Sequence, residues 1–163
     1  MSTRKLVLIS LLTALSAVGG LIKIPSPTGT IALDSLPGYL GAVILPGWPG
    51  AVVGALGHLF SSWTVSFPLG LPLHLYIALQ MAVYVVIFGF FFKKGRKIIA
   101  VALAIVLNGV VAPTLLIPIL GAGMFWALVF PLIIGSAVNI ILAALLANSN
   151  LLQKAGKEIG QNY

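Results

Sequence analysis

Long apolar segments separated by short polar ones are the dominant pattern along this chain. Each of the longest segments approaches the length of about 20 residues that a helix needs to cross the hydrocarbon core of a bilayer. The pattern therefore predicts membrane-spanning helices. The segments that meet this criterion are 6–22, 72–92, 98–120 and 125–147.

The region 31–66 is also apolar, but prolines and glycines interrupt it. We predict two short helices here, 35–46 and 48–63, which turn at the segment PGWPG. At about 1.5 Å per residue they reach roughly 18–24 Å. That is less than the ~30 Å of the hydrocarbon core, so they need cover from neighbouring helices. A re-entrant hairpin is the alternative, and it also leaves both ends of the region on one side.

The positions of the basic residues determine the predicted topology. Lys and Arg favour the cytoplasmic side of membrane proteins. Here they gather near the N-terminus, in the segment KKGRK at 93–97, and at Lys154 and Lys157. Two helices within 31–66 bring all three clusters to one side, and Lys23 is then the exception among the nine basic residues. We therefore predict an all-α bundle of six membrane helices with both termini in the cytoplasm.

Composition indicates an integral membrane protein rather than a soluble one. The chain is 60% hydrophobic and only 7% charged, whereas soluble domains carry about 25% charged residues. Its net charge of +7 comes from basic residues placed between apolar spans, which disfavours nucleic acid as a partner. The absence of cysteine excludes disulfides and thiolate chemistry. We expect residues 1–163 to form a single membrane-embedded domain.

Polar and aromatic residues collect on the side opposite the basic clusters. Under the predicted topology, the loops 23–35, 62–73 and 120–125 face outward. Polar groups within a membrane span are costly and therefore point to function. We predict an outward-opening pocket with aromatic walls, suited to a small uncharged heteroaromatic or sugar-bearing ligand. The candidate binding residues are Lys23, Asp34, Ser35, His58, Trp63, Phe67, His74, Asn108, Trp126 and Asn139.

Each candidate also has a purely structural interpretation. Asp34 and Ser35 would cap the following helix, and Lys23 would extend towards lipid headgroups. The two histidines would bond backbone carbonyls, and with one nearby carboxylate they form only a weak metal signature, so we predict no metal. Trp63 and Trp126 fit an interfacial aromatic belt. The two candidate asparagines would join helices by hydrogen bonds.

The chain lacks the groups that would let it run a reaction or hydrolyse ATP. The sequence contains neither a glycine-rich phosphate loop with its lysine nor a nucleophile elbow. Asp34 has no second carboxylate nearby in the sequence, because Glu158 belongs to the C-terminal tail. Paired ionisable groups and duplicated halves, which are typical of ion-coupled carriers, are also missing. We therefore predict that the chain is not an enzyme and that other subunits supply the energy for transport.

Three segments resemble the substrate-binding S components of energy-coupling-factor (ECF) vitamin transporters. They are RKLVLISLLTALSAVGGLIKIP, ALDSLPGYLGAVILPGWPGAVVGALGHLFS and FPLGLPLHL, and the resemblance covers essentially the whole chain. It implies a multi-pass protein of the bacterial plasma membrane that captures a vitamin or vitamin precursor. It also implies docking on a transmembrane coupling protein and two ATPases. Those partners hydrolyse the ATP, so this chain needs no cofactor.

The resemblance further implies a docking surface on the first helix. Members of the family contact the coupling protein through small residues spaced four apart. Ser10 and Ala14 match that spacing here, with Ala17 beside them. Small residues at i and i+4 allow two helices to approach closely. The alternative is that these residues pack within the bundle itself.

Among members of the family, the chain most resembles those that bind α-ribazole, a benzimidazole nucleoside salvaged for cobalamin synthesis. The base would then stack on one of the three predicted aromatic residues. The ribose hydroxyls would bond Asp34, His58 or Asn108. Riboflavin, cobalamin or another heterocyclic vitamin suits the same residue types. The alternative functions are a self-sufficient permease or channel and a scaffold subunit without a ligand.

Overall fold

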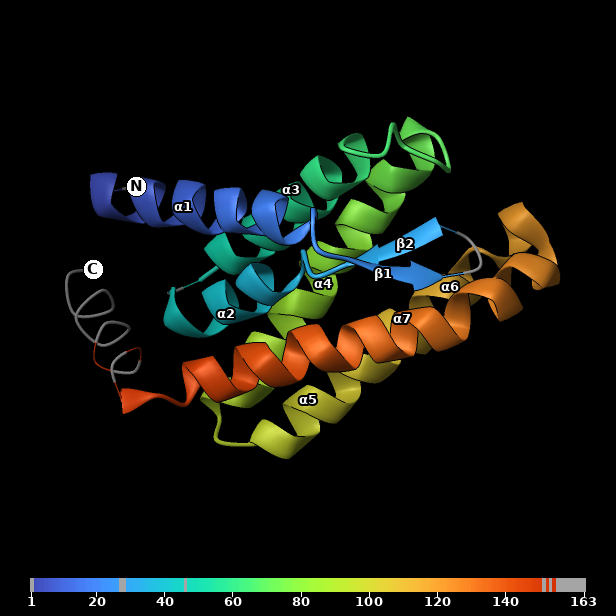
Figure 1. The fold of residues 1–163 in the computed structure, drawn as a ribbon. Helices are drawn as coiled ribbons and strands as arrows, with labels where there is room; N and C mark the ends of the chain where they lie inside the picture. The colour runs from blue at the N-terminus through green and yellow to red at the C-terminus, as the bar shows by residue number, and fades with distance from the viewer. Residues whose placement is uncertain (1, 27–28, 46, 151, 153, 155–163) are drawn as a thin grey trace.

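The protein is a bundle of helices with one short β-hairpin, as seen in a computed structural model (Figure 1). The structure describes residues 2–26, 29–45, 47–150, 152 and 154, with backbone only for 23–26 and 29–31. The hairpin lies within the predicted loop 23–35, and every other regular element of the described residues is helical. The elements are α1 (Thr3–Gly19), β1 (Lys23–Ser26), β2 (Gly29–Ala32), α2 (Leu36–Ile44), α3 (Pro49–Trp63), α4 (Leu71–Lys93), α5 (Lys97–Val106), the π-helical turn η1 (Leu107–Val111), α6 (Ala112–Leu115) and α7 (Ile117–Ala147).

Three helices of the described residues are long and apolar enough to cross a membrane: Leu71–Lys93, Lys97–Leu115 and Ile117–Ala147. They match three of the predicted spans. The remaining predicted span, 6–22, corresponds to α1, whose 17 residues end at Gly19. The protein is thus a multi-pass membrane protein, and the number of six crossings stays a prediction.

The two short helices lie inside the bundle, where their neighbours cover them. Helix α2 has 9 residues and α3 has 15, close to the predicted bounds 35–46 and 48–63. Most residues of α2 are buried. Glycines allow α2 and α3 to touch: a Cβ atom on Gly50 would lie 2.5 Å from Cα of Ala42. The cover that their length requires comes from α1, α4 and α7.

The predicted outer loop 120–125 is reduced to a break at Gly121, which separates two helical parts of α7. Helix α6 ends at Leu115, and α7 begins two residues later at Ile117. Only Gly121, with a φ of 80°, leaves the helical conformation. A positive φ is accessible to glycine at low cost, so the chain bends at this point without a loop.

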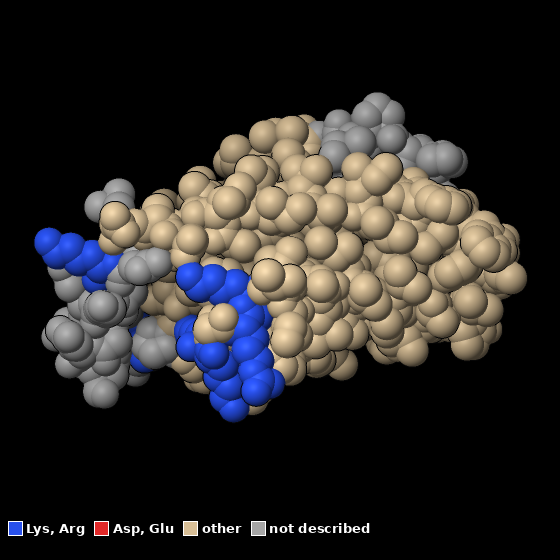
Figure 2. Space-filling model, turned by 90° about the horizontal axis from the view of Figure 1, so that it is seen from below, with Lys and Arg blue, Asp and Glu red and all other residues tan. Residues whose placement is uncertain are grey.

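The two ends of the bundle differ in chemistry. Figure 1 shows the N-terminus, the α2–α3 turn, the α4–α5 turn and the end of α7 at one end. The hairpin, the α3–α4 loop, α6 and the start of α7 lie at the other end. Figure 2 shows the Lys and Arg side chains gathered at the first end on the face that it presents. The arrangement agrees with the charge argument, while the cytoplasmic placement of that end stays a prediction. Lys157 and Glu158 lie outside the described residues.

Candidate functional site

A cavity of about 540 Å³ lies towards the hairpin end of the bundle. Its wall comes from the segment between β2 and α2, from α3, α4, η1 and α6, and from α7. Most of the lining residues are aliphatic, methionine or proline. The polar lining residues are Asp34, Ser35, His58, Ser61, Ser62, His74, Asn108, Ser136 and Asn139.

Six of the ten candidate binding residues line this one cavity, although they are far apart in the sequence. They come from the segment before α2, from α3 and α4, and from η1 and α7. Polar groups placed singly in apolar spans therefore converge on one space when the helices pack. These six are Asp34, Ser35, His58, His74, Asn108 and Asn139.

Of the other four candidates, Trp63, Phe67 and Trp126 are not among the described residues of the wall. Trp63 and Trp126 are each 65% exposed, which fits the alternative of an interfacial aromatic belt. The ring of Phe67 packs against His74, with ring centroids 5.6 Å apart. Lys23 pairs with Ala32 in the hairpin, and its side chain lies outside the described part of the structure.

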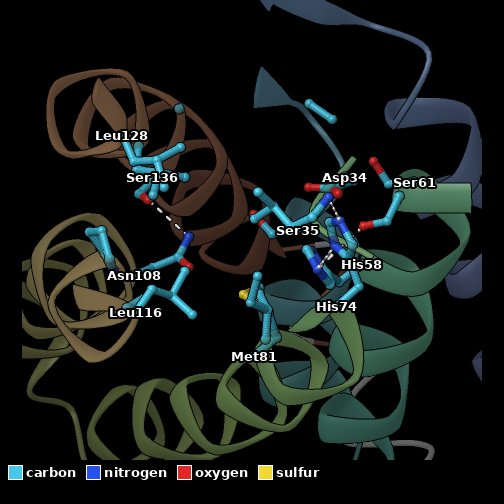
Figure 3. A pocket seen from close by; sticks show the side chains of 18 of the residues that line it. Asp34, Ser35, His58, Ser61, His74, Met81, Asn108, Leu116, Leu128 and Ser136 are labelled. Carbon is cyan, nitrogen blue, oxygen red and sulfur yellow. Dashed lines mark hydrogen bonds between the residues drawn. The ribbon is translucent and has the colours of Figure 1, made fainter. Parts of the chain in front are cut away.

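The wall is not aromatic as predicted. Its described residues include no Phe, Tyr or Trp, and the imidazoles of His58 and His74 are the only aromatic rings among them. Met81, Leu116 and Leu128 provide apolar surface instead (Figure 3). The predicted tryptophans lie near helix ends, where the amphipathic indole favours the outer surface of the bundle. A flat ring bound in the cavity would therefore make dispersion contacts with these side chains instead of stacking on an aromatic ring.

Two serines of α3 belong to the wall but were not candidates. Ser61 and Ser62 follow His58 by three and four residues, a spacing that places all three on one helix face. That spacing was the available signal. Ser62 Oγ lies 3.3 Å from His58 Nε2, so the serine supports the histidine directly.

The two histidines form a hydrogen-bonded pair. His58 Nε2 lies 3.1 Å from His74 Nδ1, and the backbone N–H of Leu69 donates to His74 Nε2 over 3.4 Å. Because Nε2 of His74 accepts, a neutral His74 carries its proton on Nδ1 and donates it to His58. A neutral His58 then carries its own proton on Nδ1. The pair therefore leaves His58 with one N–H donor for a ligand.

Asp34 lies next to this pair, in the loop between β2 and α2 (Figure 3). Surrounding protein raises the pKa of the Asp34 carboxyl to about 6, because burial disfavours the charged form. The Ser61 hydroxyl and nearby backbone N–H groups favour the charged form, but less strongly. The side chain of Ser35 makes no capping hydrogen bond to α2. A carboxyl with this pKa changes its charge within the physiological range.

A second polar group faces Asp34 and the histidines across the cavity. Asn108 Nδ2 donates to Ser136 Oγ over 2.9 Å, which joins η1 to α7. Figure 3 shows this pair on one side of the cavity and Asp34, His58 and His74 on the other. The site can therefore hold a molecule that is polar at both ends and apolar between them.

The candidate docking residues lie on the opposite face of α1 from its packed side. Ser10 and Ala14 are exposed and Ala17 is half-buried, whereas Leu12 and Ser16 are buried against the bundle. The alternative that all three pack within the bundle is therefore wrong for Ser10 and Ala14. Because their side chains are small, they form a shallow depression on this face of α1, where another helix could approach closely.

The model of the family described as "ECF transporter, substrate-specific component" matches residues 4–148, which is most of the chain. A search of curated proteins finds no match.

Proposed function

Since this chain belongs to the family of ECF transporter substrate-specific components, we propose that it captures a vitamin or vitamin precursor for import, with α-ribazole as the first candidate. Membership makes it a transport subunit rather than an enzyme. We place it in the bacterial plasma membrane, with the cavity end outward. The observation that carries the proposal is the cavity itself, with hydrogen-bonding groups on two facing walls.

The chemistry of the cavity supports a neutral ligand with an apolar ring. The described lining residues include no Lys or Arg, but they do include Asp34, which carries a carboxyl group. A phosphate or carboxylate would be desolvated there without a positive partner, which is costly. The ribose hydroxyls of α-ribazole can donate to Asp34 and accept from His58. Its benzimidazole can lie on Met81 and Leu116, with Asn108 available to its far edge. Riboflavin remains an alternative ligand, whereas cobalamin carries a phosphodiester and is disfavoured by the same argument.

The proposed partners are a transmembrane coupling protein and two ATPases, which dock on the face of α1 that carries Ser10 and Ala14. The test is to purify the protein in mild detergent, identify co-purifying ligands by native mass spectrometry, and titrate a vitamin panel. Tight binding of one panel member, with uptake into liposomes only when the coupling protein and ATPases are present, is the expected result. Uptake by this chain alone would identify a permease, and no binding across the panel would favour a scaffold.

Filling the small-residue face of α1 should impair uptake but not ligand binding. We expect Ala14→Leu to lower uptake by the complete transporter at least about fivefold, because overfilling a close helix contact costs about 1–3 kcal/mol. Affinity measured on the isolated chain should not change, since Ala14 is not part of the cavity wall. Ala102→Leu, at an exposed alanine of α5, is the matched control. Equal uptake by both variants would place the docking surface elsewhere.

Binding should depend on pH through Asp34. Ligand hydroxyls donate to the ionised carboxylate, and the pKa of Asp34 is raised to about 6. Affinity should therefore increase about tenfold between about pH 5 and about pH 7, as the carboxyl loses its proton. Isothermal titration across this range measures the effect. The imidazoles of His58 and His74 also face the cavity, so Asp34→Asn serves as the control and should flatten the profile. A profile that persists in that variant would assign the dependence to the histidines.

A further inference from the structure

Asn139 differs from the other polar residues of the cavity wall in how its side chain is bonded. It is 2% exposed and makes three hydrogen bonds, all to backbone groups. Its Oδ1 accepts from the N–H of Leu36 at 2.9 Å. Its Nδ2 donates to the carbonyl of Ala32 at 3.2 Å and to the carbonyl of Gly135 at 2.9 Å.

Two of these bonds grip both ends of the short segment that carries Asp34. Ala32 is the last residue of β2 and Leu36 is the first residue of α2, so Asp34 lies between the two anchor points. Ser35 makes no side-chain capping bond to α2. The amide of Asn139 therefore satisfies an N-terminal N–H group of α2 from another helix, in place of a local cap.

The bonding of Asn139 leaves little for a ligand. An asparagine amide has two N–H donors and an oxygen with two lone pairs. Both donors and one lone pair are already used by the backbone. Asn108 is different, because the one hydrogen bond of its side chain within the described structure goes to Ser136. A ligand that needs an amide partner can therefore bond Asn108 without breaking existing contacts.

The same segment is held from the other side by Ile22, just before β1, and by Gly19, at the end of α1. The N–H of Leu33 donates to the carbonyl of Ile22 at 3.1 Å. A Cβ atom on Gly19 would lie 2.2 Å from the carbonyl oxygen of Leu33, so the two backbones are in close contact. The segment that carries Asp34 is thus fixed between α1 and α7, and Asn139 supplies the α7 side.

We propose that Asn139 is a positioning residue, which holds the segment 32–36 against α7 and thereby fixes the Asp34 carboxyl at the cavity wall. It acts on the ligand through Asp34 and not by contact. The part of this inference that concerns ligand affinity rests on the proposed function. The part that concerns the segment does not, and it can be tested without any ligand.

The first experiment measures residue-resolved hydrogen exchange of the purified protein in detergent. In Asn139→Ala, exchange of the Leu36 N–H should be about tenfold faster, because its partner is lost. Ile140→Val is the matched control: this fully buried neighbour loses one methyl group but no hydrogen bond, and exchange at Leu36 should not change. Unchanged exchange in Asn139→Ala would overturn the proposal. If that variant does not fold, Asn139→Thr takes its place in the comparison, because a single hydroxyl replaces the amide and cannot make all three bonds.

The second experiment is a double-mutant cycle with α-ribazole as the probe. Asn139→Ala should weaken binding severalfold in the wild-type background and have little further effect in Asp34→Asn, since both changes act through one carboxyl. Additive losses would overturn the route through Asp34 and indicate a direct contact. If the wild-type chain binds neither α-ribazole nor any vitamin of the panel, the proposed function fails. The exchange measurement still decides the positioning role.

Discussion

Replacing Asp34 by Asn should weaken ligand binding about 5- to 150-fold and leave the protein folded. The range corresponds to about 1–3 kcal/mol, the usual contribution of a hydrogen bond to a charged group. Asparagine retains the shape of the side chain, but it loses the negative charge that accepts strongly from ligand hydroxyls. Titration of α-ribazole, or of the panel member that binds best, measures the change at about pH 7, where the carboxyl is mostly ionised.

The stability of the same variant distinguishes a binding role from a structural one. Because burial raises the pKa of Asp34, the folded state holds this proton more tightly than the unfolded state does. The ionised carboxyl therefore lowers the free energy of unfolding as the pH rises from about 4 through about 6. Removing the charge should leave the melting temperature unchanged or higher at neutral pH. Lower stability with unchanged affinity would instead mean that Asp34 serves only to cap α2.

Adding one methyl group at Gly50 should disrupt the contact between α2 and α3. A Cβ atom there would lie 2.5 Å from both Cα and N of Ala42. These are backbone atoms, so no side-chain rotation relieves the clash, and α2 and α3 must move apart. We expect Gly50→Ala to lower the free energy of unfolding by about 3 kcal/mol, the upper end of the usual cost of overpacking. Thermal unfolding in detergent, followed by size-exclusion chromatography, measures the loss.

Gly123 provides the matched control for this substitution. It lies in α7, and a Cβ atom there would meet nothing within 4 Å. Gly123→Ala should therefore be neutral or stabilising by up to about 1 kcal/mol, because alanine favours helix more than glycine does. Equal stability of the two variants would show that α2 and α3 are not in close contact in the folded protein.

Much of the candidate site could be predicted because polar groups are conspicuous in apolar spans. Asp34, His58, His74 and Asn108 interrupt otherwise hydrophobic sequence, and the membrane makes such interruptions costly unless they have partners or a function. Ser61 was missed because a small hydroxyl side chain is unremarkable in a helix. Its position three residues after His58 is the one feature that sets it apart. That spacing is informative only when it is known that the histidine faces inward.

The two tryptophans could not be placed from the sequence, because their position along the chain suits two environments. A tryptophan near a helix end suits either a ligand pocket or the membrane interface. The rotation of each helix about its axis decides which, and packing against neighbours sets that rotation. Trp63 and Trp126 both turn outward, and the methionine and leucine side chains of the wall take the place expected of them.

The positions of the long apolar helices can be read from the sequence alone, and so can the separation of the basic residues from the hydrogen-bonding ones. Both follow from the cost of placing each residue in hydrocarbon or in water, which each stretch of sequence pays independently of the others. The bond between Asn139 and the backbone of Leu36, 103 positions away, and the bend at Gly121 become visible only in the folded chain. Such choices depend on which elements meet in space, and no local pattern records that.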